Sequence, residues 1–91
     1  MTKIEETRIQ PGGIEAIDQL RKIAHRHEAG TVNEVLIDAP SAAVTVQLFD
    51  ALNPKNQAKI LTFPVGMIVE VAWELALKQG RVEFRATYNQ T

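Results

Sequence analysis

The sequence predicts a small, mostly helical α+β domain with short strands at its N- and C-terminal ends. Residues 14–28 place apolar side chains at helical spacing, and residues 64–79 combine strong helix formers with a nearly continuous apolar surface. Residues 81–88 alternate apolar and polar side chains, which is typical of a strand. The alternative is a βαββαβ-type two-layer sandwich, in which the strands are residues 32–37, 44–48 and 67–77.

The length of 91 residues allows one hydrophobic core, so we expect a single domain over residues 1–91. Ten basic and eleven acidic side chains give a formal charge of −1, which provides no overall field to attract nucleic acid or an anionic membrane. The chain has no cysteine, no visible signal segment and no apolar run long enough to span a bilayer. We therefore expect a soluble, cytoplasmic protein with no membrane contact.

Residues 3–9 are rich in charged and β-branched side chains and precede the turn signal Pro11-Gly12-Gly13. We expect an edge strand or an ordered arm here, pairing with residues 81–88. In the helix predicted over residues 14–28, the apolar side chains occupy an arc about 120° wide. These side chains are Ala16, Ile17, Leu20, Ile23, Ala24 and His27. Gly30 is expected to cap the C-terminal end.

His25 and His27 form a His-x-His pair, which raises the question of a metal site. On a helix, residues two apart point about 200° away from each other, so the two rings cannot share a metal ion. We interpret His27 as a packed or helix-end residue whose charge suits the C-terminal dipole. His25 is interpreted as a solvated surface residue.

Two segments in the middle of the chain each allow two interpretations. Thr31 and Glu34 have capping-box spacing for a short helix through Asp38, whereas residues 35–37 equally suit a buried strand. Ser41 is suited to cap a helix running to Leu52. The face predicted for that helix consists of Val44, Leu48, Ala51 and Leu52, and a strand through Val44, Val46 and Leu48 is the less favoured alternative.

Proline residues mark the predicted starts of the next two segments. Asn53 is a good N-cap and Pro54 is tolerated at the first helical position, so the sequence predicts a short helix over residues 54–62. Phe63-Pro64 begins the next segment in the same way.

Residues 64–79 carry the most information. As a helix, this segment has one polar row, Glu70, Glu74 and Lys78, with Met67 as an apolar residue within the polar sector. About 240° of the remaining surface is apolar, so the helix is predicted to be either central or part of a self-association surface. A strand continuing through a turn at Gly80 also fits the alternation, but the length and the helix formers favour a helix.

The chemistry expected of an enzyme is missing from the sequence. Pro11-Gly12-Gly13 lacks the lysine and the strand-loop-helix context of a phosphate-binding loop. Ser41 has no histidine near it in sequence and is better explained as a cap than as a nucleophile. Carboxylates are scattered over solvated positions, which leaves no route to a raised catalytic pKa. We expect a non-enzymatic protein with no catalytic residues, cofactor or metal.

The favoured functional hypothesis is a small interaction or regulatory protein that forms a homodimer or binds a protein partner. The residues predicted to form the self-association surface are Met67, Val71, Trp73 and Leu75. Trp73, the only tryptophan, is interpreted first as a core anchor rather than as a ligand-stacking residue.

The alternative is a helix-turn-helix or winged-helix protein that binds nucleic acid. Residues 51–69 contain no acidic side chain, and a helix N-terminus in this segment carries residue types that contact phosphates and base edges. The predicted contacts are Lys55, Asn56, Gln57 and Lys59, extended by Arg81 and Arg85. The neutral overall charge argues against this hypothesis.

Overall fold

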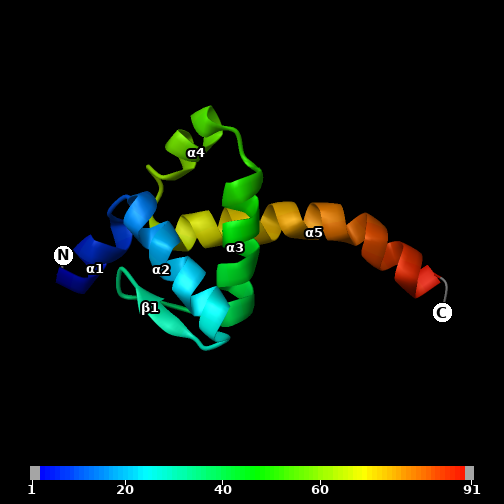
Figure 1. Cartoon of the computed structure of the whole chain (residues 1–91), viewed down its shortest axis with the longest axis horizontal. Coiled ribbons are helices and arrows are strands. Elements are labelled where there is room, and N and C mark those ends of the chain that lie inside the picture. The colour runs from blue at the N-terminus through cyan, green and yellow to red at the C-terminus, as the bar shows by residue number, and fades with distance from the viewer. Residues whose placement is uncertain (1–2, 90–91) are drawn as a thin grey trace.

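The computed structural model describes the backbone of residues 3–89 and the side chains of residues 4–78 (Figure 1). Within that part, the chain forms five helices and one antiparallel hairpin. In order, these are α1 (Lys3–Ile9), α2 (Gly13–Arg26), β1 (Gly30–Val32), β2 (Val35–Ile37), α3 (Ala39–Ala51), α4 (Pro54–Ile60) and α5 (Val65–Asn89). The fold is therefore the predicted mostly helical α+β class, and the two-layer sandwich is wrong.

The strands do not lie at the chain ends, as the sequence had indicated. Residues 3–9 form α1, in which Glu5 and Glu6 in the first turn and Arg8 in the last turn complement the helix dipole. Residues 81–88 belong to α5, whose backbone continues through Gly80 to Asn89. A helix-interior glycine costs only about 1 kcal/mol, so the strong helix formers before it carry the helix onward.

Helix α2 buries most of the predicted apolar face, with Ala16, Ile17, Leu20 and Ile23 in the core, whereas Ala24 is half-buried and His27 is exposed. The helix ends at Arg26 with His27 as its C-cap, so Gly30 does not cap it as predicted. His27 adopts the left-handed conformation (φ 59°), and its backbone N–H donates to the carbonyl of Ile23 at 3.1 Å. Gly30 instead begins β1, where a Cβ atom would lie 2.9 Å from the Ile23 side chain. His27 is thus a helix-end residue, one of the two roles predicted for it.

The hairpin resolves the ambiguity over residues 31–38 in favour of a strand. Val32 pairs with Val35 across a two-residue turn, and both turn residues, Asn33 (φ 50°) and Glu34 (φ 62°), are left-handed. Positive φ at both positions defines a type I′ turn, whose twist matches that of the strands. The capping box predicted at Thr31 does not form. Val32 and Ile37 enter the core, and Arg8 Nε donates to the Glu34 carbonyl at 2.9 Å.

Helix α3 is capped by Asp38 rather than by Ser41. The Asp38 carboxylate accepts a hydrogen bond from the Ser41 backbone N–H at 2.8 Å. The buried residues of α3 are Ala42, Thr45 and Phe49. The face predicted from the sequence is therefore not the buried one: Val44, Leu48 and Leu52 are half-buried and Ala51 is exposed. Thr45 is tolerated in the core because its hydroxyl donates to the Ser41 carbonyl at 2.7 Å.

Helix α4 begins as predicted, with the Asn53 side chain accepting from the Asn56 N–H at 2.9 Å. It ends at Ile60, and the following turn is held to the start of α2. The backbone N–H groups of Gly12 and Gly13 donate to the carbonyls of Phe63 (2.8 Å) and Leu61 (3.0 Å). These bonds bring the N-terminal end of α2 beside the N-terminal end of α5.

Helix α5 packs against α3 and α1, and α3 also packs against α2. Its fully covered side chains form one stripe, Val65, Ile68 and Ala72. C-terminal to Ala72, α5 continues beyond the other elements of the fold (Figure 1). The radius of gyration is accordingly 14.3 Å, against about 12 Å for a compact domain of this length.

Candidate functional site

The outer face of α5, opposite the buried stripe, consists of Met67, Glu70, Glu74, Leu77 and Lys78. All five side chains are exposed, with Met67 at 48% and Leu77 at 57%. The helix prediction for this segment is confirmed. Of the two predicted positions for this helix, a central one covered on most sides within one chain is not observed, because only Val65, Ile68 and Ala72 are fully buried.

The four residues predicted for self-association lie on three sides of α5. Met67 is on the outer face. Val71 and Leu75 together line a groove beside α4, and Leu75 is 40% exposed. Trp73 is half-buried, and its indole Nε1 donates to Ser41 Oγ at 2.8 Å. Trp73 therefore anchors α5 to α3 within the chain, and only the other three can meet a partner together.

The groove lies between α3, α4 and α5 and has a volume of about 280 Å³. Its apolar walls come from Leu48, Leu52, Ile60, Phe63, Val71 and Leu75. Asn56 and Lys59 of α4 complete the lining. Sequence reasoning missed this groove because its walls come from three helices whose relative placement no local signal specifies.

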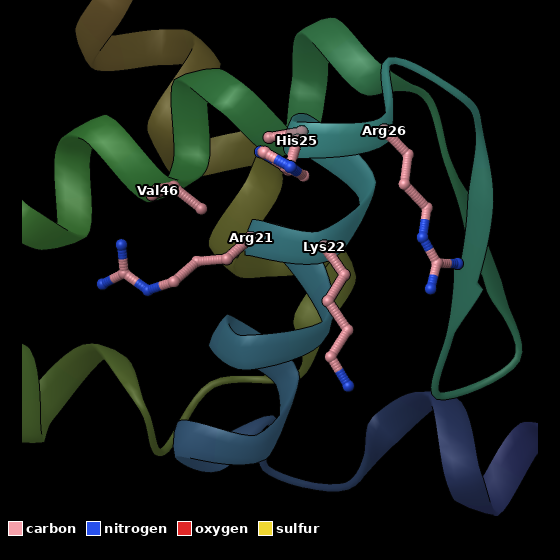
Figure 2. Close-up of a pocket in the computed structure, with 6 residues that line it drawn as sticks. Arg21, Lys22, His25, Arg26 and Val46 are labelled. Atoms are coloured by element: carbon pink, nitrogen blue, oxygen red, sulfur yellow. The ribbon is translucent and has the colours of Figure 1, made fainter.

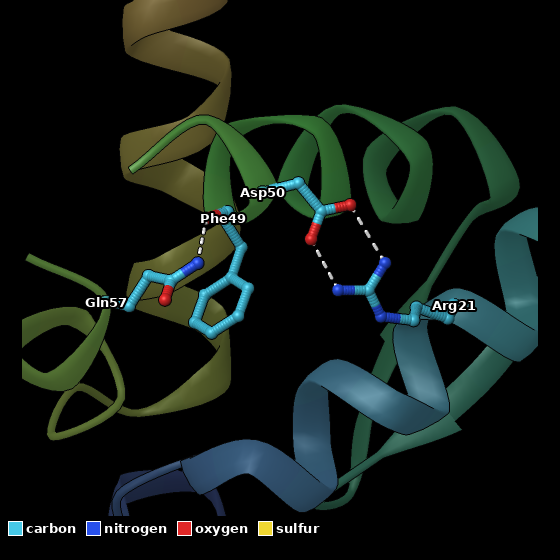
Figure 3. A network of polar contacts seen from close by, with 4 residues as sticks. All are labelled: Arg21, Phe49, Asp50 and Gln57. Atoms are coloured by element: carbon cyan, nitrogen blue, oxygen red, sulfur yellow. Dashed lines mark hydrogen bonds and ion pairs between the residues drawn. The ribbon is translucent and has the colours of Figure 1, made fainter. Parts of the chain in front are cut away.

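Of the six residues predicted to contact nucleic acid, four lie on α4 and two on α5. Lys55, Asn56 and Lys59 are exposed on α4, but the Gln57 amide donates to the Phe49 carbonyl at 2.8 Å and is occupied (Figure 3). The side chains at positions 81 and 85 lie outside the described residues, and the C-terminal half of α5, to which both positions belong, extends away from α4 (Figure 1). The predicted extension of the patch along a strand is wrong, because that segment is helical.

A shallow hollow of about 570 Å³ lies over α2, lined by Arg21, Lys22, His25 and Arg26 together with Ala24 and Val46. Figure 2 shows the charged ends of Arg21, Lys22 and Arg26 pointing in different directions. The sequence had placed these residues on the solvated face, and the run RKIAHR was the signal for their clustering. Because the charges diverge, the hollow does not present a shared binding point.

Arg21 is already paired within the chain. Its guanidinium donates two hydrogen bonds to the Asp50 carboxylate of α3, one of them 2.9 Å long (Figure 3). These bonds hold the pKa of Asp50 below its usual value and raise that of Arg21. At the start of α3, hydrogen bonds from Ser41 similarly lower the pKa of Asp38. Both carboxylates therefore stay ionised to a lower pH than an isolated aspartate.

Among the described residues, no group of three or more histidine, aspartate or glutamate side chains is placed to hold a metal ion. In the same part of the chain, no helix is both long and apolar enough to cross a bilayer.

The one serine in the sequence, Ser41, accepts the hydrogen bond from Trp73 described above. Comparison of the chain with protein-family models, curated proteins and solved structures yields no match.

Proposed function

We propose that this protein is a small, non-enzymatic interaction or regulatory protein that self-associates through α5. The observation that carries the proposal is the exposure of Met67 (48%) and Leu77 (57%) on the outer face of a helix that then continues beyond the body. Burying such side chains between two copies contributes about 1.5–3 kcal/mol for each one fully covered. We place the assembly in the cytoplasm by default.

The projecting half of α5 supports the same proposal. The C-terminal half of α5, which ends at Asn89, extends past the other elements (Figure 1). Isolated helices shorter than about 12–15 residues are marginal in water, and most helices in proteins are held by packing of an apolar face. A second copy lying along this segment would supply that packing.

Light scattering on the purified chain at micromolar concentrations tests the proposal, and we expect the mass of a dimer. The variant Leu77→Asp should yield monomers. Its matched control is Leu36→Asp, since Leu36 is 73% exposed on the hairpin and lies outside the proposed surface. A monomeric wild type, or equal loss of the dimer in both variants, would contradict the proposal.

Nucleic-acid binding through α4 is the second candidate. Lys55, Asn56 and Lys59 are exposed, and neither lysine has an ion-pair partner among the described residues. Duplex DNA titrated at low salt should then bind the wild type and bind Lys55→Glu/Lys59→Glu more weakly. Absence of binding by the wild type at low salt would eliminate this candidate.

A further inference from the structure

The outer face of α5 belongs to a longer stripe with a regular spacing. Positions 67, 70, 74 and 77 are separated by three and four residues, and the same repeat continues at positions 81, 84 and 88. This three-four spacing keeps a row of residues on one side of a helix, and helices that pair lengthwise carry apolar side chains at most positions of such a row. In the sequence, four of the seven positions are apolar or aromatic: Met67, Leu77 and positions 84 and 88. In the described half, each member of the row is exposed.

Charge is divided between the two halves of that stripe. The half on the body of the protein carries Glu70 and Glu74, whereas the sequence places arginines at positions 81 and 85 of the projecting half. The one acidic residue of the projecting half is at position 83. The helical repeat places that position on the opposite side, in line with Val65 and Ala72.

We propose that two copies pair along α5 in antiparallel orientation, with a two-fold axis passing near Leu77. This arrangement rests on the self-association proposed above and specifies its partner and direction. It sets the acidic half of each helix against the basic half of the other, with Glu74 beside position 81 and Glu70 beside position 85. Parallel pairing would instead set acidic against acidic and basic against basic.

The two kinds of residue have different roles in this interface. The charges select the antiparallel direction and disfavour the parallel one, because like charges set against each other in an interface are repulsive. Leu77 meets its copy at the axis, and Met67 lies at each end beside position 88, so apolar burial supplies the affinity. Positions 67–88 span about 32 Å at a rise of about 1.5 Å per residue, so the paired surface runs along most of α5.

Charge exchange between the two halves tests the direction. Glu70→Arg/Glu74→Arg makes the stripe wholly basic, and Arg81→Glu/Arg85→Glu makes it wholly acidic. Each variant alone should dimerise at least about tenfold more weakly than the wild type at low salt, and an equimolar mixture should restore the dimer. Lys55→Glu/Lys59→Glu, on α4, is the control for a charge change of equal size, and circular dichroism confirms that each variant folds.

Cysteine cross-linking gives an independent reading, because the natural chain has no cysteine. With a short bis-maleimide, Leu77→Cys should cross-link efficiently, since the two copies of this residue meet at the axis. Met67→Cys should not, because antiparallel pairing separates its two copies by more than about 25 Å. Cross-linking of both variants would mean parallel pairing.

Two other outcomes distinguish this arrangement from self-association itself. A wild-type dimer that neither charge exchange weakens would overturn the antiparallel arrangement but not the proposal that the chain self-associates. A monomeric wild type would overturn both proposals.

Discussion

The Trp73 indole Nε1 and the Ser41 hydroxyl oxygen lie 2.8 Å apart in a hydrogen bond that ties the middle of α5 to the first turn of α3. The backbone N–H of Ser41 also donates to the Asp38 carboxylate, and its carbonyl accepts from the Thr45 hydroxyl. The cap of α3 and the docking of α5 therefore share one residue. This link orients α5 so that its outer face is turned away from the body.

Replacing Trp73 by phenylalanine removes the indole donor while keeping an aromatic ring. We expect the free energy of unfolding to fall by about 1 kcal/mol, measured by urea denaturation. Ser41→Ala should cost a similar amount, and the double variant less than the sum of the two, because both remove the same bond. Strict additivity would show that the hydrogen bond does not contribute to stability.

The left-handed conformation of His27 strains a residue that carries a Cβ atom. His27→Gly should raise the free energy of unfolding by roughly 0.5–1 kcal/mol, because glycine adopts this conformation without that penalty. The matched control is His25→Gly inside α2, which should lower stability by about 1 kcal/mol. A loss of stability in His27→Gly would show that the imidazole makes a contribution larger than the strain.

Glu34 occupies the second position of the type I′ turn with a φ of 62°. Glycine is the preferred residue there, so Glu34→Gly should stabilise the protein by roughly 0.5–1 kcal/mol in thermal or urea unfolding. The hydrogen bond from Arg8 is made to the backbone carbonyl and should survive the change. As a control, Thr31→Gly in the adjacent strand should be destabilising.

The Arg21 ion pair makes stability depend on pH in the acid range. The pKa of Asp50 is lower in the folded chain than its ordinary value of 3.8, so the pair stabilises the fold above that value and the stabilisation is lost as the pH falls through the folded pKa. Asp50→Asn should therefore have a lower melting temperature than the wild type at neutral pH. The melting temperatures of Asp50→Asn and the wild type, measured as a function of pH, should become equal in acid.

High salt should also narrow the difference between Asp50→Asn and the wild type, because the pair is exposed. Glu28→Gln, which alters an exposed carboxylate outside the helices, serves as the control for removing one negative charge. An Asp50→Asn difference that persisted unchanged in strong acid would contradict the assignment.

The sequence by itself determined the elements whose signals act over a few residues. The periodicity of residues 14–28 specified α2 and its buried face, and the Asn53-Pro54 pair specified the start of α4. The helix formers of residues 64–79 specified α5, including its exposed row Glu70, Glu74 and Lys78. Of the predicted association residues, Met67 lies on the surface proposed for pairing, whereas Val71 and Leu75 line the groove beside α4 and Trp73 contacts α3.

Only the tertiary structure decided which sides of those elements are covered. Helix α3 is apolar around most of its circumference, so its buried side, Ala42, Thr45 and Phe49, depends on where α2 and α5 cross it. The strands predicted for residues 3–9 and 81–88 are helical in the structure, since short alternating segments suit a strand or a helix until a neighbour is present. Burial is a property of pairs of elements, and a local pattern specifies only one member of each pair.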